Sequence, residues 1–155
     1  LKDKYDAIAS IEMIEAVGEK YLNKYFSTIK NNLKPGGIGA IQAIIIKDEL
    51  FSRYRRNQDF IQKYIFPGGF LPSLQSIKDY SKKTGLILKD YNSYGSHYSH
   101  TLSKWRSNFI NSWNNISQQG FDNTFKKIWD FYFSYCEAGF RAKNIDLIQF
   151  SVRNK

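Results

Sequence analysis

The segment YDAIASIEMIEAVGEKYLNKYFSTIKNNLKPGGIGAIQAIII, residues 5–46, has the pattern of a strand, a helix and a second strand. Its first part, residues 5–11, is a compact apolar run that is typical of a buried parallel strand. Residues 18–33 repeat apolar side chains at helical spacing, and KPGG at 34–37 is expected to end that helix. Residues 38–46 form a second apolar run. This order predicts a βαβ unit with two parallel strands.

Further helices and two more strands are predicted downstream of this unit. In chain order they are a helical stretch at 48–64, a loop at 64–73, a short helix at 73–84, a strand at 86–95, two long helices around 102–116 and 125–140, and an alternating strand at 146–153. The chain is therefore predicted to be α/β, with a helical block between its last two strands. Two or three parallel strands do not complete a doubly wound sheet. We expect the missing strands to precede Leu1 in a longer protein.

Composition narrows the class of protein. The 155 residues suffice for one domain with a core. The single cysteine cannot form an internal disulfide, which favours a reducing, cytoplasmic setting. The net charge of +9 favours an anionic partner, either nucleic acid or an acidic membrane surface, although solubility alone also accounts for it. No apolar run reaches the length of about 18 residues that a transmembrane helix needs.

Two carboxylates follow the first predicted strand. Glu12 and Glu15 lie in an otherwise apolar run, just past residues 5–11. Ligands bind at the carboxyl ends of the strands in open α/β sheets, and a carboxylate there can orient a ligand or accept a proton. A solvated turn or a helix N-terminus that favours negative charge is the competing explanation. The spacing does not choose between the two residues.

Other motif classes find little support. The chain has no GxGxxG, no P-loop and no serine nucleophile elbow. His97 and His100 are three residues apart without a second cluster of ligands, so a polar helix N-terminus is predicted rather than a metal site. RYRRNQ at 53–58 is basic, but its ring does not alternate with charges on a strand, which argues against a nucleic-acid module. Cys136 lies on the apolar stripe of the last helix, where a core thiol is the default interpretation.

Five stretches together resemble one family. They are YDAIASIEMIEAVGEKYLNKYF at 5–26, NLKPGG at 32–37, DFIQKYIFPGGFLPSL at 59–74, YGSHYSHTLSKWRSNF at 94–109 and FYFSYCEAGFRAKNIDLIQF at 131–150. In this order they resemble the C-terminal half of a cyclopropane-fatty-acyl-phospholipid synthase, a relative of the mycolic acid cyclopropane synthases. The resemblance runs over essentially the whole chain.

The resemblance implies a partial Rossmann-like class I S-adenosylmethionine methyltransferase fold with an inserted helical cover over the acyl site. It implies that residues 1–155 are the C-terminal portion of one methyltransferase domain, with the cofactor-binding half upstream. The implied reaction is methyl transfer from S-adenosylmethionine to the cis double bond of an unsaturated phospholipid acyl chain. In this family a bound bicarbonate is thought to take the proton whose loss closes the cyclopropane ring. Because the implied cofactor-binding half lies upstream, the fragment alone is expected to bind S-adenosylmethionine poorly and to be inactive.

Site residues also follow from the resemblance. Glu15 matches the glutamate that helps to hold bicarbonate, and Tyr98 matches a tyrosine beside the same anion. Ile44 matches a residue whose backbone N–H reaches that anion. Glu12 falls where relatives vary, so it is expected to be structural or to support the site from behind. The resemblance thus selects Glu15 from the pair of carboxylates.

Two further positions need separate interpretation. Gln42 stands where many family members have histidine, which puts proton shuttling at this position in doubt but not anion binding. Cys136 matches a cysteine that was once assigned as the nucleophile. Because the implied chemistry needs no covalent enzyme intermediate, we interpret Cys136 as structural.

Aromatic residues are candidates for lining the acyl site. A transient carbocation favours a dry site with electron-rich rings. The candidates are Phe66, Phe70, Tyr94, Tyr98 and Tyr135, mostly in the loop and helices outside the βαβ unit. Core packing is the competing explanation for each single ring.

The expected partners are an anionic phospholipid membrane surface and unsaturated acyl chains, without nucleic acid. The expected location is cytoplasmic, peripheral to the inner membrane face. A homodimer is also expected from the resemblance, because members of the family often dimerise. Two alternatives stay open: a methyltransferase of the same fold that acts on a small molecule, and a degenerate lipid-binding module. The sequence does not reveal whether the product is a cyclopropane, a methyl-branched or a methylene-bearing chain.

Overall fold

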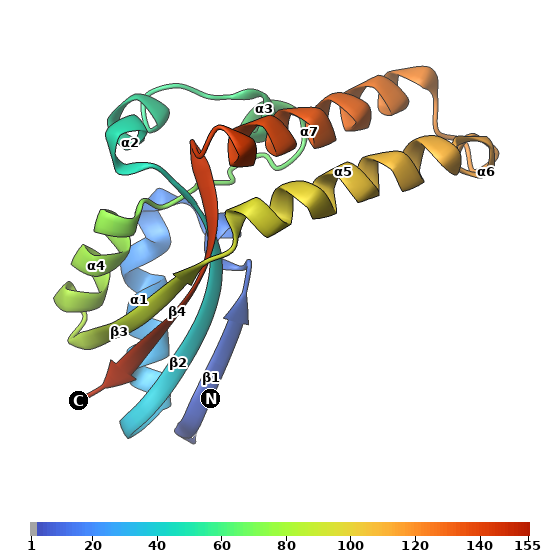
Figure 1. Ribbon diagram of the computed structural model, residues 1–155. Coiled ribbons are helices and arrows are strands. Elements are labelled where there is room, and N and C mark those ends of the chain that lie inside the picture. Colours follow the sequence, from blue (N-terminus) through green and yellow to red (C-terminus); the bar gives the residue numbers. More distant parts are fainter. Residues whose placement is uncertain (1–2) are drawn as a thin grey trace. The chain divides into compact units, whose positions relative to one another are not determined.

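Two compact units make up the chain (Figure 1). The computed structural model describes residues 3–155. The first unit, here called the sheet unit, contains the residues up to Tyr94 together with Asp146–Lys155. The second, the helical unit, is Gly95–Ile145. The helical unit is therefore an insertion between the last two strands of the sheet, as the sequence predicts.

The sheet unit is built on a mixed four-stranded sheet of order β1-β2-β4-β3. Its strands are β1 (Tyr5–Ile11), β2 (Leu33–Ile46), β3 (Leu86–Ser93) and β4 (Ile145–Asn154). β1 and β2 are parallel, which confirms the predicted βαβ unit. β3 and β4 are antiparallel, so the sheet combines a parallel half with an antiparallel half.

Helices and short 3-10 turns connect the strands. They are a 3-10 turn at Ile14–Ala16, a second at Glu19–Tyr21, α1 (Leu22–Asn32), α2 (Asp48–Tyr54), α3 (Phe60–Tyr64) and α4 (Leu74–Lys83). The single helical stretch expected at 48–64 is wrong, because the chain makes two short helices there. α3 restarts at a capping box formed by Asp59 and Gln62. α4 begins at a second capping box, formed by Ser73 and Ser76.

The KPGG sequence lies inside β2 rather than in a turn. The helix does end just before it, at Asn32, but the strand begins at once at Leu33. Gly36 has a positive φ of 79°, which favours glycine. A Cβ at Gly37 would lie 3.0 Å from the carbonyl oxygen of Asp6 on β1. The two glycines therefore let the strand continue through an irregular pairing with β1.

The core of the sheet unit lies between one face of the sheet and the helices. α1 contributes buried side chains that include Phe26 and Ile29, and β2 contributes Ile41 and Ala43. The opposite face of β2 is more exposed, and Ile38 on that face is 50% exposed. Alternating positions of β2 therefore separate a packed face from an open face.

β1 is exposed along most of its length. The prediction that this strand is buried on both faces is therefore wrong for residues 3–155. β1 is at the edge of the sheet and pairs only with β2 among the described strands. Its apolar side chains lack a cover in this part of the chain, which accounts for an apolar run that is not buried.

The helical unit contains α5 (Gly95–Asn111), α6 (Trp113–Ser117) and α7 (Asn123–Arg141). α5 and α7 lie side by side and are joined through α6 (Figure 1), which confirms the two predicted long helices. Phe109 packs against Phe125 and Phe133, with ring centroids 6.3 and 5.7 Å apart. Arg106 on α5 donates to Asp130 on α7 at 2.6 Å. Aromatic packing and this ion pair thus hold the two helices together.

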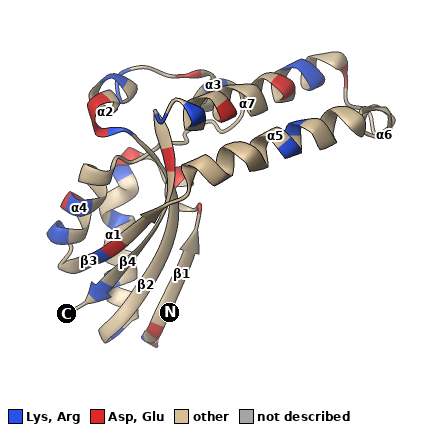
Figure 2. Cartoon of the chain, viewed as in Figure 1, with Lys and Arg blue, Asp and Glu red and all other residues tan. Residues whose placement is uncertain are grey.

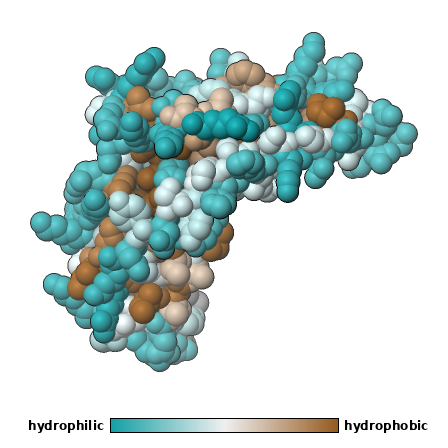
Figure 3. Space-filling view, viewed as in Figure 1, coloured by the Kyte–Doolittle hydropathy of each residue, from teal (hydrophilic) through white to brown (hydrophobic). Residues whose placement is uncertain are grey.

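Charged and apolar residues are interspersed. Lys and Arg are spread over both units rather than gathered in one block (Figure 2). The face in Figure 3 shows hydrophobic patches on the sheet unit between hydrophilic residues. Among residues 3–155, no helix is both long and apolar enough to cross a bilayer.

Candidate active site

The site lies where β1 and β2 end. β1 is followed by the 3-10 turn at Ile14–Ala16, which carries Glu15, and Ile14 is fully buried beneath it. Glu12 turns the chain with a positive φ of 50°. Its backbone N–H donates to the carbonyl oxygen of Gln42 at 2.9 Å. The pairing with β2 and the anchor at Ile14 therefore place both carboxylates at the strand ends.

Glu15 has one satisfied and one unsatisfied oxygen. Its Oε1 accepts a hydrogen bond from the backbone N–H of Ile44 at 2.5 Å. Its Oε2 is buried, and no hydrogen-bond partner for it exists among the described residues. Burial raises the pKa of Glu15 above its ordinary value, the bond from Ile44 opposes this in part, and the charge of Glu12 adds to the increase. Burial therefore makes the ionised form of Glu15 more costly than in an exposed carboxylate, and a protonated carboxyl group at this position would be a hydrogen-bond donor to a ligand.

The contact of Ile44 differs from the expectation. The resemblance implied that the N–H of Ile44 reaches an anion directly, whereas here it donates to Glu15. The structure therefore brings Glu15 and Ile44 together, with the backbone of β2 holding the carboxyl group in place.

Gln42 lies two residues before Ile44 on the same face of β2, and both sides of its amide are engaged. Its Nε2 donates to Oε1 of Glu12 at 2.8 Å. Its Oε1 accepts from Nε2 of Gln149, on β4, also at 2.8 Å. The three side chains form a chain of hydrogen bonds that joins the turn after β1 to β2 and β4.

Tyr25 is a neighbour of the site that sequence reasoning missed. Its hydroxyl donates to Oγ of Ser10 at 2.7 Å. Burial raises the pKa of Tyr25, the bond with Ser10 opposes this, and the charge of Glu15 adds to it. Helical spacing places Tyr25 on an apolar stripe and does not reveal its hydroxyl contact. A serine inside the apolar run 5–11 was the one available signal.

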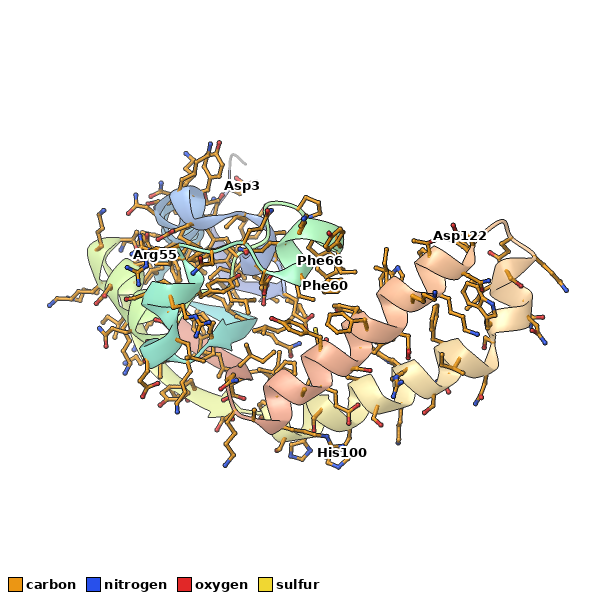
Figure 4. All side chains as sticks on the ribbon, turned by 90° about the horizontal axis from the view of Figure 1, so that it is seen from above. Asp3, Arg55, Phe60, Phe66, His100 and Asp122 are labelled. Atoms are coloured by element: carbon orange, nitrogen blue, oxygen red, sulfur yellow. The ribbon has the colours of Figure 1, made fainter. Side chains whose placement is uncertain are left out.

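The loop between α3 and α4 packs against the turn that carries Glu15. The backbone N–H of Phe70 donates to the carbonyl oxygen of Glu15 at 2.8 Å. Phe70 itself is buried against Phe51 and Tyr54, so packing accounts for this ring. Phe66 is 53% exposed, and Figure 4 shows it close to Phe60.

Three predicted site residues lie in the helical unit. Tyr98 packs edge-on against Phe140, with ring centroids 5.0 Å apart. Tyr135 is 42% exposed and stacks on Phe131. Cys136 is half-buried and is not part of a disulfide. Their roles at the site stay predictions, as does that of Tyr94, which is half-buried just after β3.

The two histidines lie in the first turns of α5. Nδ1 of His100 is 2.9 Å from the carbonyl oxygen of Ser96, and its ring projects outward from the helix (Figure 4). Within residues 3–155, no group of three or more His, Cys, Asp or Glu side chains is arranged to hold a metal ion.

An apolar groove follows the outer edge of β1. It has a volume of about 710 Å³ and is walled by β1 and α1. Tyr5 and Ile8 line it from the strand, Met13 from the following turn, and Tyr21 and Ile29 from the helical side. An open strand edge beside apolar side chains is a surface that another strand or helix can cover.

Known proteins resemble the chain over nearly its whole length. The mycolic acid cyclopropane synthetase family model matches residues 1–150. A tuberculostearic acid methyltransferase of Mycobacterium tuberculosis is 42% identical over 150 residues, and the cyclopropane-fatty-acyl-phospholipid synthase of Escherichia coli K12 is 35% identical over 150 residues. Both alignments cover 96% of this chain but 35% and 37% of those proteins. The chain thus spans about a third of the length of these relatives.

Solved structures agree with the family match. The mycolic acid cyclopropane synthase CmaA1 complexed with SAH and CTAB has a TM-score of 0.86 at 25% identity, over 99% of this chain and 57% of that one. The cyclopropane synthase MmaA2 of Mycobacterium tuberculosis has a TM-score of 0.87 at 23% identity, with the same coverage. The predicted α/β class and the S-adenosylmethionine methyltransferase fold are therefore confirmed. By its sequence match and by its fold, the chain belongs to the mycolic acid cyclopropane synthetase family.

Proposed function

We propose that the enzyme containing this chain transfers a methyl group from S-adenosylmethionine to the cis double bond of an unsaturated phospholipid acyl chain. The electron pair of the double bond forms the new C–C bond, and the sulfur keeps the electrons of the S–CH₃ bond that breaks. A carbocation remains on the neighbouring carbon. Loss of a proton from the new methyl group leaves the C–H electrons to close the cyclopropane ring.

Glu15 is the observation that carries this proposal. A buried carboxyl group with a raised pKa and an unsatisfied Oε2 suits a small anion, because the neutral acid donates a hydrogen bond instead of repelling charge. The residues therefore fit bicarbonate, which Glu15 and the amide of Gln42 would hold. Bicarbonate, when bound, supplies the base for the final deprotonation.

The rest of the chain would supply the substrate side of the site. Exposed rings such as Phe66 and Tyr135 are suited to line an apolar path for the acyl chain and to stabilise a nearby cation. Tyr98 is proposed to face the anion, as the family resemblance implies. The net charge of +9 favours an anionic phospholipid surface, and such binding weakens with salt.

We also propose that this chain is the C-terminal portion of a methyltransferase domain and does not turn over by itself. The open edge of β1 and the groove of about 710 Å³ beside it are the surfaces that the remaining part of the sheet would cover. Calorimetry of the isolated chain with S-adenosylmethionine is expected to show weak or no binding. Tight binding would refute this part of the proposal.

A methyl-branched product is the second candidate. The match at 42% identity to a tuberculostearic acid methyltransferase favours it, against 35% for the cyclopropane-forming synthase of Escherichia coli. Both products would pass through the same carbocation: loss of a proton from the new methyl group closes the ring, whereas a saturated methyl-branched chain also needs a hydride from an external reductant. The anion site of Glu15 favours proton loss, and therefore the cyclopropane.

The test uses the full-length enzyme, meaning this chain with any further segment its gene encodes. It is incubated with S-adenosylmethionine and vesicles of a cis-unsaturated anionic phospholipid, with saturated vesicles as the control. The expected result is a mass gain of one CH₂ unit on unsaturated acyl chains only, with ring protons in the NMR spectrum, and slower turnover after bicarbonate is removed. Methylation of a soluble small molecule without any change to lipid would contradict the proposal.

A further inference from the structure

We propose that Glu12 and Gln149 are positioning residues that lock the amide of Gln42, so that it presents an N–H rather than a carbonyl oxygen at the strand-end site. This inference rests on the proposed function. It concerns three side chains from β4, β2 and the turn after β1, which are joined by two hydrogen bonds of 2.8 Å. It specifies which group Glu12 supports, where the resemblance left its role open between structure and support of the site.

The direction of the amide follows from the chemistry of its partners. A glutamine amide has two N–H donors and one acceptor oxygen, whereas an ionised carboxylate only accepts. Glu12 therefore selects the Nε2 side of Gln42, and Gln149 donates to the Oε1 side. If the amide turned over, Oε1 of Gln42 would face Oε1 of Glu12. The hydrogen bond between Gln42 and Glu12 would be lost, and the two oxygens would repel each other. Nε2 carries a second N–H, for which no acceptor is found among residues 3–155, and this N–H is available to a ligand.

Glu12 is itself fixed at two points. Its side chain accepts from the amide of Gln42, and its backbone N–H donates to the carbonyl oxygen of the same residue at 2.9 Å. Its φ of 50° lies in the left-handed region, which is strained for a residue other than glycine. Strain of this kind persists only where the surroundings determine it. The turn thus holds the carboxylate in place against Gln42.

The locked amide and the carboxyl group of Glu15 are both held at the same end of β2: Gln42 through Glu12, and Glu15 through Ile44, with Glu12 close enough for its charge to act on Glu15. Gln42 and Ile44 are alternate residues of β2, so their side chains leave the same face of the sheet. The N–H of Ile44 holds Glu15. An amide that offers N–H there adds a second neutral donor to the site, whereas an amide turned over would offer a carbonyl oxygen and repel an anion.

Exchanging the carboxylate and the amide between positions 12 and 149 tests whether the orientation of the Gln42 amide matters, or only the presence of its two hydrogen bonds. In the double variant Glu12→Gln/Gln149→Glu, position 12 donates to Oε1 of Gln42 and position 149 accepts from its Nε2. Both hydrogen bonds are then restored, with the amide turned over. In the full-length enzyme we expect unfolding in urea close to wild type, but a kcat at least about tenfold lower, because the reacting groups lose their alignment. Asp90→Ala, which removes the hydrogen bond that the hydroxyl of Ser151 on β4 donates to Asp90 on β3, is the control outside the site.

The outcomes are separable. A double variant with wild-type stability and wild-type kcat would overturn the proposal, because a merely structural chain of bonds tolerates the exchange. In the single variant Gln149→Glu the amide of Gln42 lies between two carboxylates, and its Oε1 loses its donor. We expect a lowered kcat that recovers as the pH falls, because the new carboxyl group at position 149 then gains a proton and can donate. A flat pH profile relative to wild type would also count against the proposal. If wild-type enzyme methylates only a soluble substrate, the proposed function fails, while the comparison of kcat and stability still tests the lock.

Discussion

Replacing Glu15 by glutamine is expected to make the protein more stable at neutral pH. The wild-type carboxylate leaves Oε2 buried without a partner, and a buried unsatisfied group costs about 1–3 kcal/mol. Glutamine keeps the acceptor for the N–H of Ile44 and removes the charge, but its NH₂ group occupies the same unsatisfied position. Only part of the cost is therefore recovered. We expect a gain of about 1 kcal/mol in the free energy of unfolding.

The gain depends on pH with a definite sign. Because the pKa of Glu15 is raised in the folded state, the folded protein binds this proton more tightly than the unfolded chain does. The stability that protonation contributes is present below the ordinary pKa of 4.5 and is lost as the pH rises through the raised pKa. The variant cannot titrate at this position. The difference between the two proteins should therefore be near zero at low pH and grow towards neutral pH.

Urea unfolding of both full-length proteins, from about pH 4.5 to about pH 7, measures this difference. An unchanged m value shows that the folded states expose the same surface. Glu49→Gln is the matched control, because Glu49 is exposed and its contact with Lys47 is 3.9 Å long; we expect less than about 0.5 kcal/mol at any pH. A Glu15→Gln protein that is less stable than wild type at neutral pH would show that the ionised form is used structurally, and the reasoning would fail.

Three further changes test the packing. Gly39→Ala should destabilise by about 1–3 kcal/mol in urea unfolding, because its Cβ would lie 2.9 Å from Cγ2 of Val152; a neutral effect would mean that β4 shifts easily. Phe26→Ala should cost about 3–5 kcal/mol by the same measurement, because Phe26 is fully buried, and a loss under 1 kcal/mol would contradict the described core. Arg106→Ala should lower the free energy of unfolding by under about 1 kcal/mol, because its ion pair with Asp130 is half-exposed. A larger loss would show that the pair organises the helical unit.

The parallel half of the sheet was predictable because its signals are local. The apolar runs at 5–11 and 38–46 flank one helical stripe, and this order has few other solutions. Local reasoning failed at KPGG, since proline and glycine end the helix but also permit the irregular start of β2. It failed again at β1, where an apolar run is exposed because only β2 pairs with it among the described strands.

The site was predictable only where a resemblance or a strand end pointed to it. Glu15 and Gln42 were found in this way, and the structure brings both to the ends of β1 and β2. Gln149 was not found, because it bonds to Gln42 from 107 positions away and looks like any polar residue of an alternating strand. Tyr25 was hidden on an apolar stripe, since helical spacing describes where a side chain lies and not what its hydroxyl contacts.

Under the proposed function, the side chains that would hold bicarbonate are uncharged hydrogen-bond donors. A base must be held without losing its affinity for a proton, and a lysine or arginine beside a bound anion would lower the pKa of its conjugate acid. Glu15, when protonated, donates without a charge, and the second N–H of Gln42 does the same. Such donors orient an anion while leaving it basic enough to take a proton from a carbon next to a cation. Ionising the buried carboxyl group costs stability, and the same burial favours the neutral form that can donate to an anion without lowering its basicity.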